Sequence, residues 1–114
     1  MSLSPDLSGR TALVTGSAKR VGRELLLRIA DCGANVAVHY NESDAAAEAT
    51  AAEARERGVD AVTVGADITD PDDVDSMFEA VESELGAVDV LVNNVGDFDA
   101  RHWTEIEWAS WRNV

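Results

Sequence analysis

Short apolar runs alternate along this chain with stretches whose apolar residues recur at helical spacing. The runs that indicate strands cover residues 11–15, 35–40, 61–65 and 88–92. Runs that are apolar almost throughout, and not only at every second position, are typical of strands covered on both faces. Strands and helices that alternate in this order form a parallel sheet with right-handed crossovers. The sequence therefore predicts a doubly wound α/β fold.

Capping residues and apolar stripes mark the expected helices. The clearest helix has Asp70 as N-cap, Pro71 at its first position and Gly86 at its end. Its apolar residues 74, 77, 78, 81 and 85 form a single stripe. An earlier helix is expected before Gly33, from a stripe formed by Val21, Leu25, Leu26 and Ile29. A second begins after a cap at Ser43 and runs to Gly58, and a last one begins at a Thr104–Glu107 capping box.

The charge of the chain limits its partners. Asp and Glu total 22 against nine Lys and Arg, a net charge of −13. Such a surface repels nucleic acids and anionic membranes, so we expect neither as a partner. Lys19 is the single lysine, and this acidic, lysine-poor balance is expected either of a halophilic protein or of an ordinary acidic one. An N-terminus without a hydrophobic leader and a lone Cys32 predict a cytoplasmic protein with no internal disulfide and no metal site.

The loop after the first strand, TGSAKRVG at residues 15–22, has the composition of an anion site. Glycine allows a tight turn and a close approach of phosphate, and the following helix supplies free N–H groups. Lys19, Arg20 and Arg23 gather three of the nine basic residues within five positions. The sequence alone leaves open a plain turn with exposed basic residues and no ligand.

Two common phosphate motifs do not fit this loop. A triphosphate P-loop needs four residues between its glycines, whereas five separate Gly16 from Gly22, and G-x-G-x-x-G is also absent. The segment instead resembles the T-G-x-x-x-G-x-G loop of short-chain dehydrogenases/reductases, and the resemblance covers essentially the whole chain. Arg20 stands where that family usually has its middle glycine. This form is similar to pteridine-reductase-like and 3-oxoacyl-carrier-protein-reductase-like members.

The resemblance implies a Rossmann-type fold and a dinucleotide site at the strand ends. Tyr40 occupies the position where NAD-binding members carry a carboxylate, which together with Lys19 and Arg20 favours NADP, whereas Glu42 leaves NAD possible. The cofactor-binding residues implied by the resemblance are Gly16, Ser17, Lys19, Arg20, Val21, Gly22, Tyr40, Asn41, Ser43, Asp67, Ile68, Asn93, Asn94, Val95 and Gly96.

Some of these residues also have purely structural interpretations. Asn41 and Ser43 can cap a helix, and Asp67 can be a solvated loop aspartate. In the family, Asp67 would contact the adenine amine, and the segment from Asn93 to Gly96 resembles an N-N-A-G motif that borders the ribose. His39 lies in a strand without a partner pattern, so we assign it no catalytic role.

The family's reaction needs residues that this sequence does not offer. Its tyrosine acid and nearby lysine find no match, because Tyr40 and Lys19 are the single residues of their types and both fall in the cofactor site. We therefore name no catalytic residue and expect 1–114 to be one incomplete NAD(P)-binding domain, truncated after the fourth strand and the start of a fourth helix. We expect the intact protein to be a homo-oligomeric oxidoreductase that moves hydride between NADP(H) and a carbonyl or alcohol. The alternatives are a non-catalytic nucleotide-binding or regulatory module and a decayed fragment.

Overall fold

The computed structural model describes residues 6–94, and these form a parallel sheet with helices on both faces. The strands are β1 (Thr11–Val14), β2 (Asn35–Tyr40), β3 (Ala61–Gly65) and β4 (Val90–Val92). The helices are α1 (Arg20–Asp31), α2 (Asp44–Glu56) and α3 (Pro71–Leu85). The strand order is β3-β2-β1-β4, and every pairing is parallel. The predicted α/β fold is confirmed.

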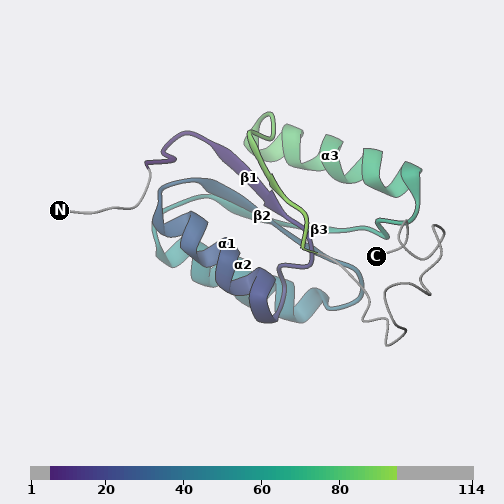
Figure 1. Cartoon of the computed structure of the whole chain (residues 1–114), viewed down its shortest axis with the longest axis horizontal. Helices are drawn as coiled ribbons and strands as arrows, with labels where there is room; N and C mark the ends of the chain where they lie inside the picture. Colours follow the sequence, from purple (N-terminus) through teal and green to yellow (C-terminus); the bar gives the residue numbers. More distant parts are fainter. Residues whose placement is uncertain (1–5, 95–114) are drawn as a thin grey trace, which may run out of the picture.

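Two apolar layers hold the helices against the sheet. Helices α1 and α2 cover one face and α3 covers the other (Figure 1). Side chains alternate between the faces: Val36 and Val38 of β2 pack toward α1 and α2, whereas Ala37 joins the cluster with Met77 and Val81 of α3. Since both faces of β1 and β2 are covered, these strands are apolar nearly throughout, as their sequences predict.

Small residues bring α1 and α2 close to the sheet. Ala47, Ala51 and Ala54 of α2 are fully buried, which explains the alanine-rich sequence of this helix. The buried Thr50 hydroxyl donates to Ala18 O or Ala46 O, both at 3.0 Å, and so contacts the loop that precedes α1. Arg23 of α1 also forms an ion pair with α2. The loop after β1 is therefore held from the side by α2.

Most predicted boundaries are confirmed, and one capping interaction is not. The Asp70 side chain accepts from Asp72 N at 3.0 Å, Pro71 is the first residue of α3, and Gly86 caps its end with φ +96°. Ser43 is the N-cap of α2, as predicted, but its hydroxyl makes no capping hydrogen bond. The predicted side-chain capping interaction is therefore wrong. The fourth strand is shorter than predicted, because only Val90–Val92 pairs with β1. The predicted last helix lies outside the described residues.

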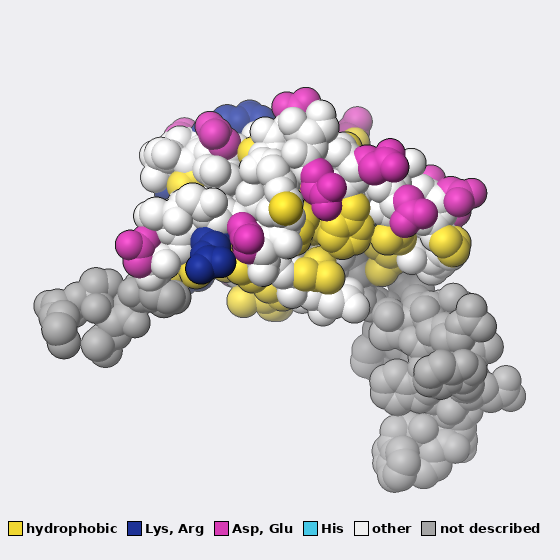
Figure 2. Space-filling view, turned by 90° about the horizontal axis from the view of Figure 1, so that it is seen from above, with side chains coloured by type: hydrophobic (Ala, Val, Ile, Leu, Met, Phe, Trp, Pro, Cys, Tyr) yellow, Lys and Arg dark blue, Asp and Glu magenta, His cyan; other side chains and the backbone are white. Residues whose placement is uncertain are grey.

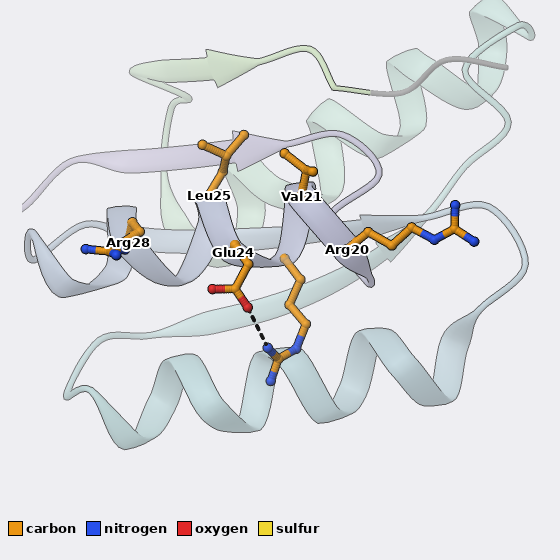
Figure 3. Close-up of a pocket in the computed structure, with 6 residues that line it drawn as sticks. Arg20, Val21, Glu24, Leu25 and Arg28 are labelled. Atoms are coloured by element: carbon orange, nitrogen blue, oxygen red, sulfur yellow. Dashed lines mark hydrogen bonds and ion pairs between the residues drawn. The ribbon is translucent and has the colours of Figure 1, made fainter. Parts of the chain in front are cut away.

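The apolar stripe of α1 is only partly buried. Leu26 is fully buried, but Val21 is 64% and Leu25 39% exposed, and their side chains point away from α2 (Figure 3). Leu91 of the edge strand β4 is also exposed. The reason is that α2 and the strands β1 and β2 contact one side of α1, while its side toward β4 has no neighbouring helix among residues 6–94. No helix in this part of the chain is long and apolar enough to cross a membrane.

Adjacent leucines of α1 provide a test of this packing. We expect Leu26→Ala to lower the free energy of unfolding by about 3 kcal/mol, because it leaves a cavity in a closed core. The matched change Leu25→Ala should cost less than about 1 kcal/mol, since that side chain is already partly in water. Urea unfolding of both variants measures the difference. Equal losses would contradict the burial assigned to α1.

Candidate functional site

The carboxyl ends of the parallel strands gather the loops of the candidate site along one edge of the sheet. These loops cover residues 15–19, 41–43, 66–70 and 93–94. The ends of β1 and β4 lie side by side, with Val14 opposite Val92, and the end of β2 pairs with that of β3 through Tyr40 and Gly65. In sheets of this kind, ligands bind beyond the carboxyl ends of the strands. The predicted site residues within 6–94 all lie there.

Hydrogen bonds join the β1 loop to the end of β4. Thr15 N donates to Val92 O at 3.0 Å, and the Thr15 hydroxyl accepts from Asn94 N at 2.8 Å. The amide group of Asn94 also reaches Gly16 O, at 3.5 Å. The hydroxyl of Thr15 lies 3.2 Å from Asn93 Oδ1. These bonds confirm that the paired asparagines lie beside the glycine loop; Val95 and Gly96 lie outside the described residues.

Gly22 marks the closest approach between α1 and this loop. A Cβ atom there would lie 2.6 Å from Asn94 Nδ2 and closer still to the carbonyl oxygen of Gly16. Real side chains do not tolerate such distances, and the contacting atoms are backbone or tied to backbone. The second glycine of the loop is therefore required because the helix start, the β1 loop and the β4 end meet at one point.

His39 joins the loop to two further strands. Its Nδ1 accepts from Gly16 N, and its Nε2 lies 2.9 Å from Ala66 O, just after β3. Ser17 completes the junction, because its amide donates to His39 O and its hydroxyl accepts from His39 N, both at 3.1 Å. Sequence analysis missed this role. A histidine in a buried strand, next to a strand end, is the one signal that could have suggested it.

The N-terminus of α1 provides the positive end of the site. The helix begins at Arg20, with Lys19 as N-cap and no side-chain capping bond. The amides of its first turn have no acceptor within the helix and carry the positive end of the helix dipole. Lys19 and Arg20 are both exposed, and neither forms an ion pair within residues 6–94. Cationic side chains and free N–H groups therefore lie together at the N-terminal end of α1.

Arg23 does not belong to this positive cluster. Its guanidinium forms ion pairs with Glu24, at 3.4 Å, and with Glu53 of α2. The prediction that three basic residues gather for an anion is therefore wrong for Arg23, which joins two helices. Lys19 and Arg20 remain as the free cations of the loop.

A hollow of about 340 Å³ lies between the β1 loop and the end of β2. Its lining residues come from both segments: Gly16, Ala18, Lys19, His39, Tyr40, Asn41, Glu42 and Ser43. A larger hollow of about 670 Å³ lies along the outer surface of α1, beside Val21, Leu25 and Arg28 (Figure 3). We assign the site to the smaller hollow, because it lies at the strand ends and contains the loop glycine and Lys19. In Figure 3, Arg20 points away from Arg28, along the direction of the helix start.

Tyr40 forms a fixed wall of the smaller hollow. A Cβ atom at Gly65 would lie 2.9 Å from Cζ of the Tyr40 ring, so the ring packs directly on the glycine backbone of β3. The aromatic side chain is half-buried against the cluster under α1 and α2. Asn41 and Glu42 beyond it are exposed, and Ser43 is partly buried. An aromatic ring whose edge and hydroxyl lie over Gly65 thus stands at this strand end in place of a carboxylate.

Two hydrogen bonds from Thr69 favour the ionised form of Asp67, in the loop after β3. Its Oδ1 accepts from the Thr69 hydroxyl at 2.6 Å and from Thr69 N at 2.9 Å. These bonds, that of the hydroxyl first, lower the pKa of Asp67 below its ordinary value. Ile68 next to it is partly buried. Neither Thr69 bond uses Oδ2, and Asp67 N donates to Asp73 of α3.

These features define a doubly wound α/β domain with a positively charged corner at its strand ends, and related proteins identify its family. A family model described as short chain dehydrogenase matches residues 10–114. The 3-oxoacyl-[acyl-carrier-protein] reductase FabG of Staphylococcus aureus is 44% identical over 87 residues, which cover 76% of this chain and 35% of that protein. The chain belongs to the short-chain dehydrogenase family, whose members are NAD(P)-dependent oxidoreductases.

Solved structures of the family have the same fold. A dehydrogenase from Burkholderia cenocepacia with bound NADP superposes with a TM-score of 0.82 at 34% identity, over 97% of this chain and 43% of that one. The landomycin C-6 ketoreductase LanV, with bound NADP and rabelomycin, superposes with a TM-score of 0.78 at 35% identity, over 96% and 47%. The chain thus spans less than half the length of these proteins.

The backbone of Arg20 makes a prediction about stability. Arg20 has φ +56°, the left-handed region that a side chain disfavours, at the position where the family pattern has glycine. We expect Arg20→Gly to be more stable than Arg20→Ala by about 1 kcal/mol, although both variants lose the same charge. Urea unfolding of the pair isolates the backbone contribution. A Gly variant that is no more stable than the Ala variant would contradict the strained conformation.

Thr69 makes a prediction about pH dependence. Removal of its hydroxyl in Thr69→Val should raise the pKa of Asp67 toward its ordinary value, whereas Thr69→Ser should keep the pKa low. A lowered folded-state pKa contributes stability above the unfolded-state pKa, and this is lost as pH falls through the folded value. At pH values above the titration of Asp67, the valine variant should therefore be less stable than the serine variant. At lower pH, where Asp67 is protonated, this difference should disappear. Carboxyl-carbon NMR of Asp67 during an acid titration measures the midpoint; identical midpoints in both variants would refute the assignment.

Proposed function

We propose that this chain is the NADP(H)-binding part of an oxidoreductase that moves hydride between NADP(H) and a small carbonyl or alcohol substrate. One observation carries the proposal: at the strand ends, the amides of the α1 N-terminus, the exposed Lys19 and Arg20, and a hollow beside Tyr40 occur together. A dinucleotide has the matching groups, namely a diphosphate, a ribose and an aromatic base.

Each segment of the site has a role in this proposal. The diphosphate binds along the loop at Gly16 and Ser17, where the backbone approaches closely, and at Val21 and Gly22, where the N–H groups of the α1 N-terminus are available. Asn93 and Asn94 border the ribose on the nicotinamide side, together with Val95 and Gly96. Oδ2 of Asp67 accepts a hydrogen bond from the adenine amine, while Oδ1 accepts from Thr69. Ile68 contacts the adenine ring.

The preference for NADP over NAD follows from charge. The end of β2 has Tyr40 and Asn41 where a carboxylate would repel a 2′-phosphate, and Ser43 offers a hydroxyl nearby. Lys19 lines the same hollow and has no acidic partner within residues 6–94. Glu42 opposes the phosphate, but it is exposed and screened by solvent. The NADP bound in the Burkholderia and LanV structures supports this choice.

The chemical step requires residues that we do not assign to this chain. Tyr40 packs on Gly65, and Lys19 lines the cofactor hollow, so neither is proposed as an acid for hydride transfer. FabG and the two solved structures extend well beyond the length that this chain matches. We therefore propose residues 1–114 as one incomplete domain whose reaction depends on further polypeptide. A nucleotide-binding module without catalysis is the alternative of a different class.

Charge and family also suggest the setting of the protein. Acidic side chains are scattered over the face seen in Figure 2, in keeping with a net charge of −13. We propose a cytoplasmic protein adapted to high salt, where counter-ions screen this repulsion within a few ångström. We further propose that the intact protein forms a homo-oligomer and has no nucleic-acid or membrane partner.

Titration of the 114-residue chain with NADPH and NADH tests this function. We expect NADPH to bind about tenfold more tightly, because Lys19 and Arg20 attract the added phosphate. Lys19→Gln should weaken NADPH binding several-fold and leave NADH binding nearly unchanged. Arg10→Gln is the matched control, since it removes the same charge next to the opposite end of β1. Folded protein that binds neither nucleotide would refute the function, and tighter NADH binding would refute the cofactor preference.

A further inference from the structure

We propose that His39 is a positioning residue for the cofactor loop: its imidazole holds Gly16 in the conformation that leaves the α1 amides free for the diphosphate. This inference rests on the proposed function, since it concerns the same site. It follows from the contacts of one buried side chain.

The partners of the imidazole fix its protonation. Gly16 N carries a hydrogen and can only donate, so Nδ1, 2.9 Å away, must be the unprotonated acceptor. Ala66 O can only accept, so Nε2, also at 2.9 Å, must carry the proton. The ring is 1% exposed, and no other tautomer or charge state satisfies both neighbours. His39 is thus a neutral imidazole that bridges the loop after β1 to the residue after β3.

The same residue also uses its backbone to hold the loop. Ser17 N donates to His39 O, and His39 N donates to the Ser17 hydroxyl, which in turn donates to Val14 O at 2.6 Å. His39 therefore occupies the amides of both Gly16 and Ser17. The amides available to an anion then include those of Arg20, Val21 and Gly22 at the start of α1, where the helix dipole also favours negative charge.

The side-chain bond to Gly16 is the one that a substitution can remove selectively. The backbone bonds between residues 17 and 39 do not depend on the side chain at position 39. Without an acceptor at Nδ1, the partly buried Gly16 amide would lose its partner or turn toward another acceptor, and that turn changes the path of the loop before Lys19. Loss of this bond should thus affect the anion site, whereas loss of the Ala66 bond should affect only stability.

Two amide side chains separate these contacts. Asparagine places an oxygen near the position of Nδ1 and can accept from Gly16 N, but it is too short to reach Ala66. Glutamine places its NH₂ group near the position of Nε2 and can donate to Ala66 O, but it offers no acceptor to Gly16. His39→Asn and His39→Gln each keep one bond and lose the other. They are therefore matched controls for each other.

The experiment measures NADPH affinity and urea stability of the 114-residue wild type and both variants. We expect both variants to lose stability, His39→Asn to bind NADPH within about twofold of wild type, and His39→Gln to bind at least about fivefold more weakly. Equal affinities of the two variants, or weaker binding by the asparagine variant, would overturn the positioning role. A merely structural histidine would make affinity follow stability.

Nitrogen NMR of the wild type decides the case in which the glutamine variant does not fold. The role requires a protonated Nε2, an unprotonated Nδ1 and a Gly16 amide protected from hydrogen exchange. A protonated Nδ1 or a freely exchanging Gly16 amide would overturn the inference. If the wild type shows this NMR signature but binds no NADPH, the proposed function is refuted, and with it any role of His39 in binding. If the wild type binds NADPH and the two variants do not differ, only the role of His39 is refuted.

Discussion

The candidate site depends on hydrogen bonds that hold the loop after β1 against both neighbouring strands. Thr15 and Gly16 are joined to Asn94 on one side, and Gly16 and Ser17 are joined to His39 on the other. Four consecutive strand ends are thus connected through one short loop. Such a loop does not depend on its ligand for its shape, so less ordering has to accompany binding. The hollow beside Tyr40 is lined by this loop and by the residues that follow β2, so these bonds also fix one of its walls.

Charge also distinguishes the corner where the loop after β1 meets the start of α1. In a chain of net charge −13, basic residues that have acidic neighbours form pairs, as Arg23 does with Glu53 and Arg57 with Asp31. Lys19 and Arg20 have no such partner in the described part of the chain and lie where α1 begins. A helix N-terminus and free cations reinforce each other, since both favour negative charge within the same few ångström. The acidic side chains elsewhere on the surface repel anions, so this positively charged corner is a local exception.

The sequence predicted the order of the elements and the position of the candidate site at the strand ends, but it did not predict roles that depend on individual side-chain contacts. The helix at Asp70–Gly86 was predictable because its cap, its first proline and its end are local signals. The convergence of Gly16 and Asn94 was predictable because parallel strand ends must meet at one edge. The roles of His39 and Arg23 were not, since each depends on one particular side-chain contact that the order of the strands does not dictate. The exposure of Val21 likewise reflects which neighbours α1 has, and helical spacing does not reveal that.

Arg20 shows how function and stability oppose each other at this corner. A glycine would adopt φ +56° without penalty, whereas a residue with a side chain costs about 1 kcal/mol there. The loop nevertheless carries arginine, at the first residue of α1, with its side chain exposed and free of ion pairs among residues 6–94. Packing does not explain this choice, because the side chain is not part of either apolar cluster. A positive charge at the mouth of the proposed anion site would explain it, so the strained residue supports the proposal that this corner binds phosphate.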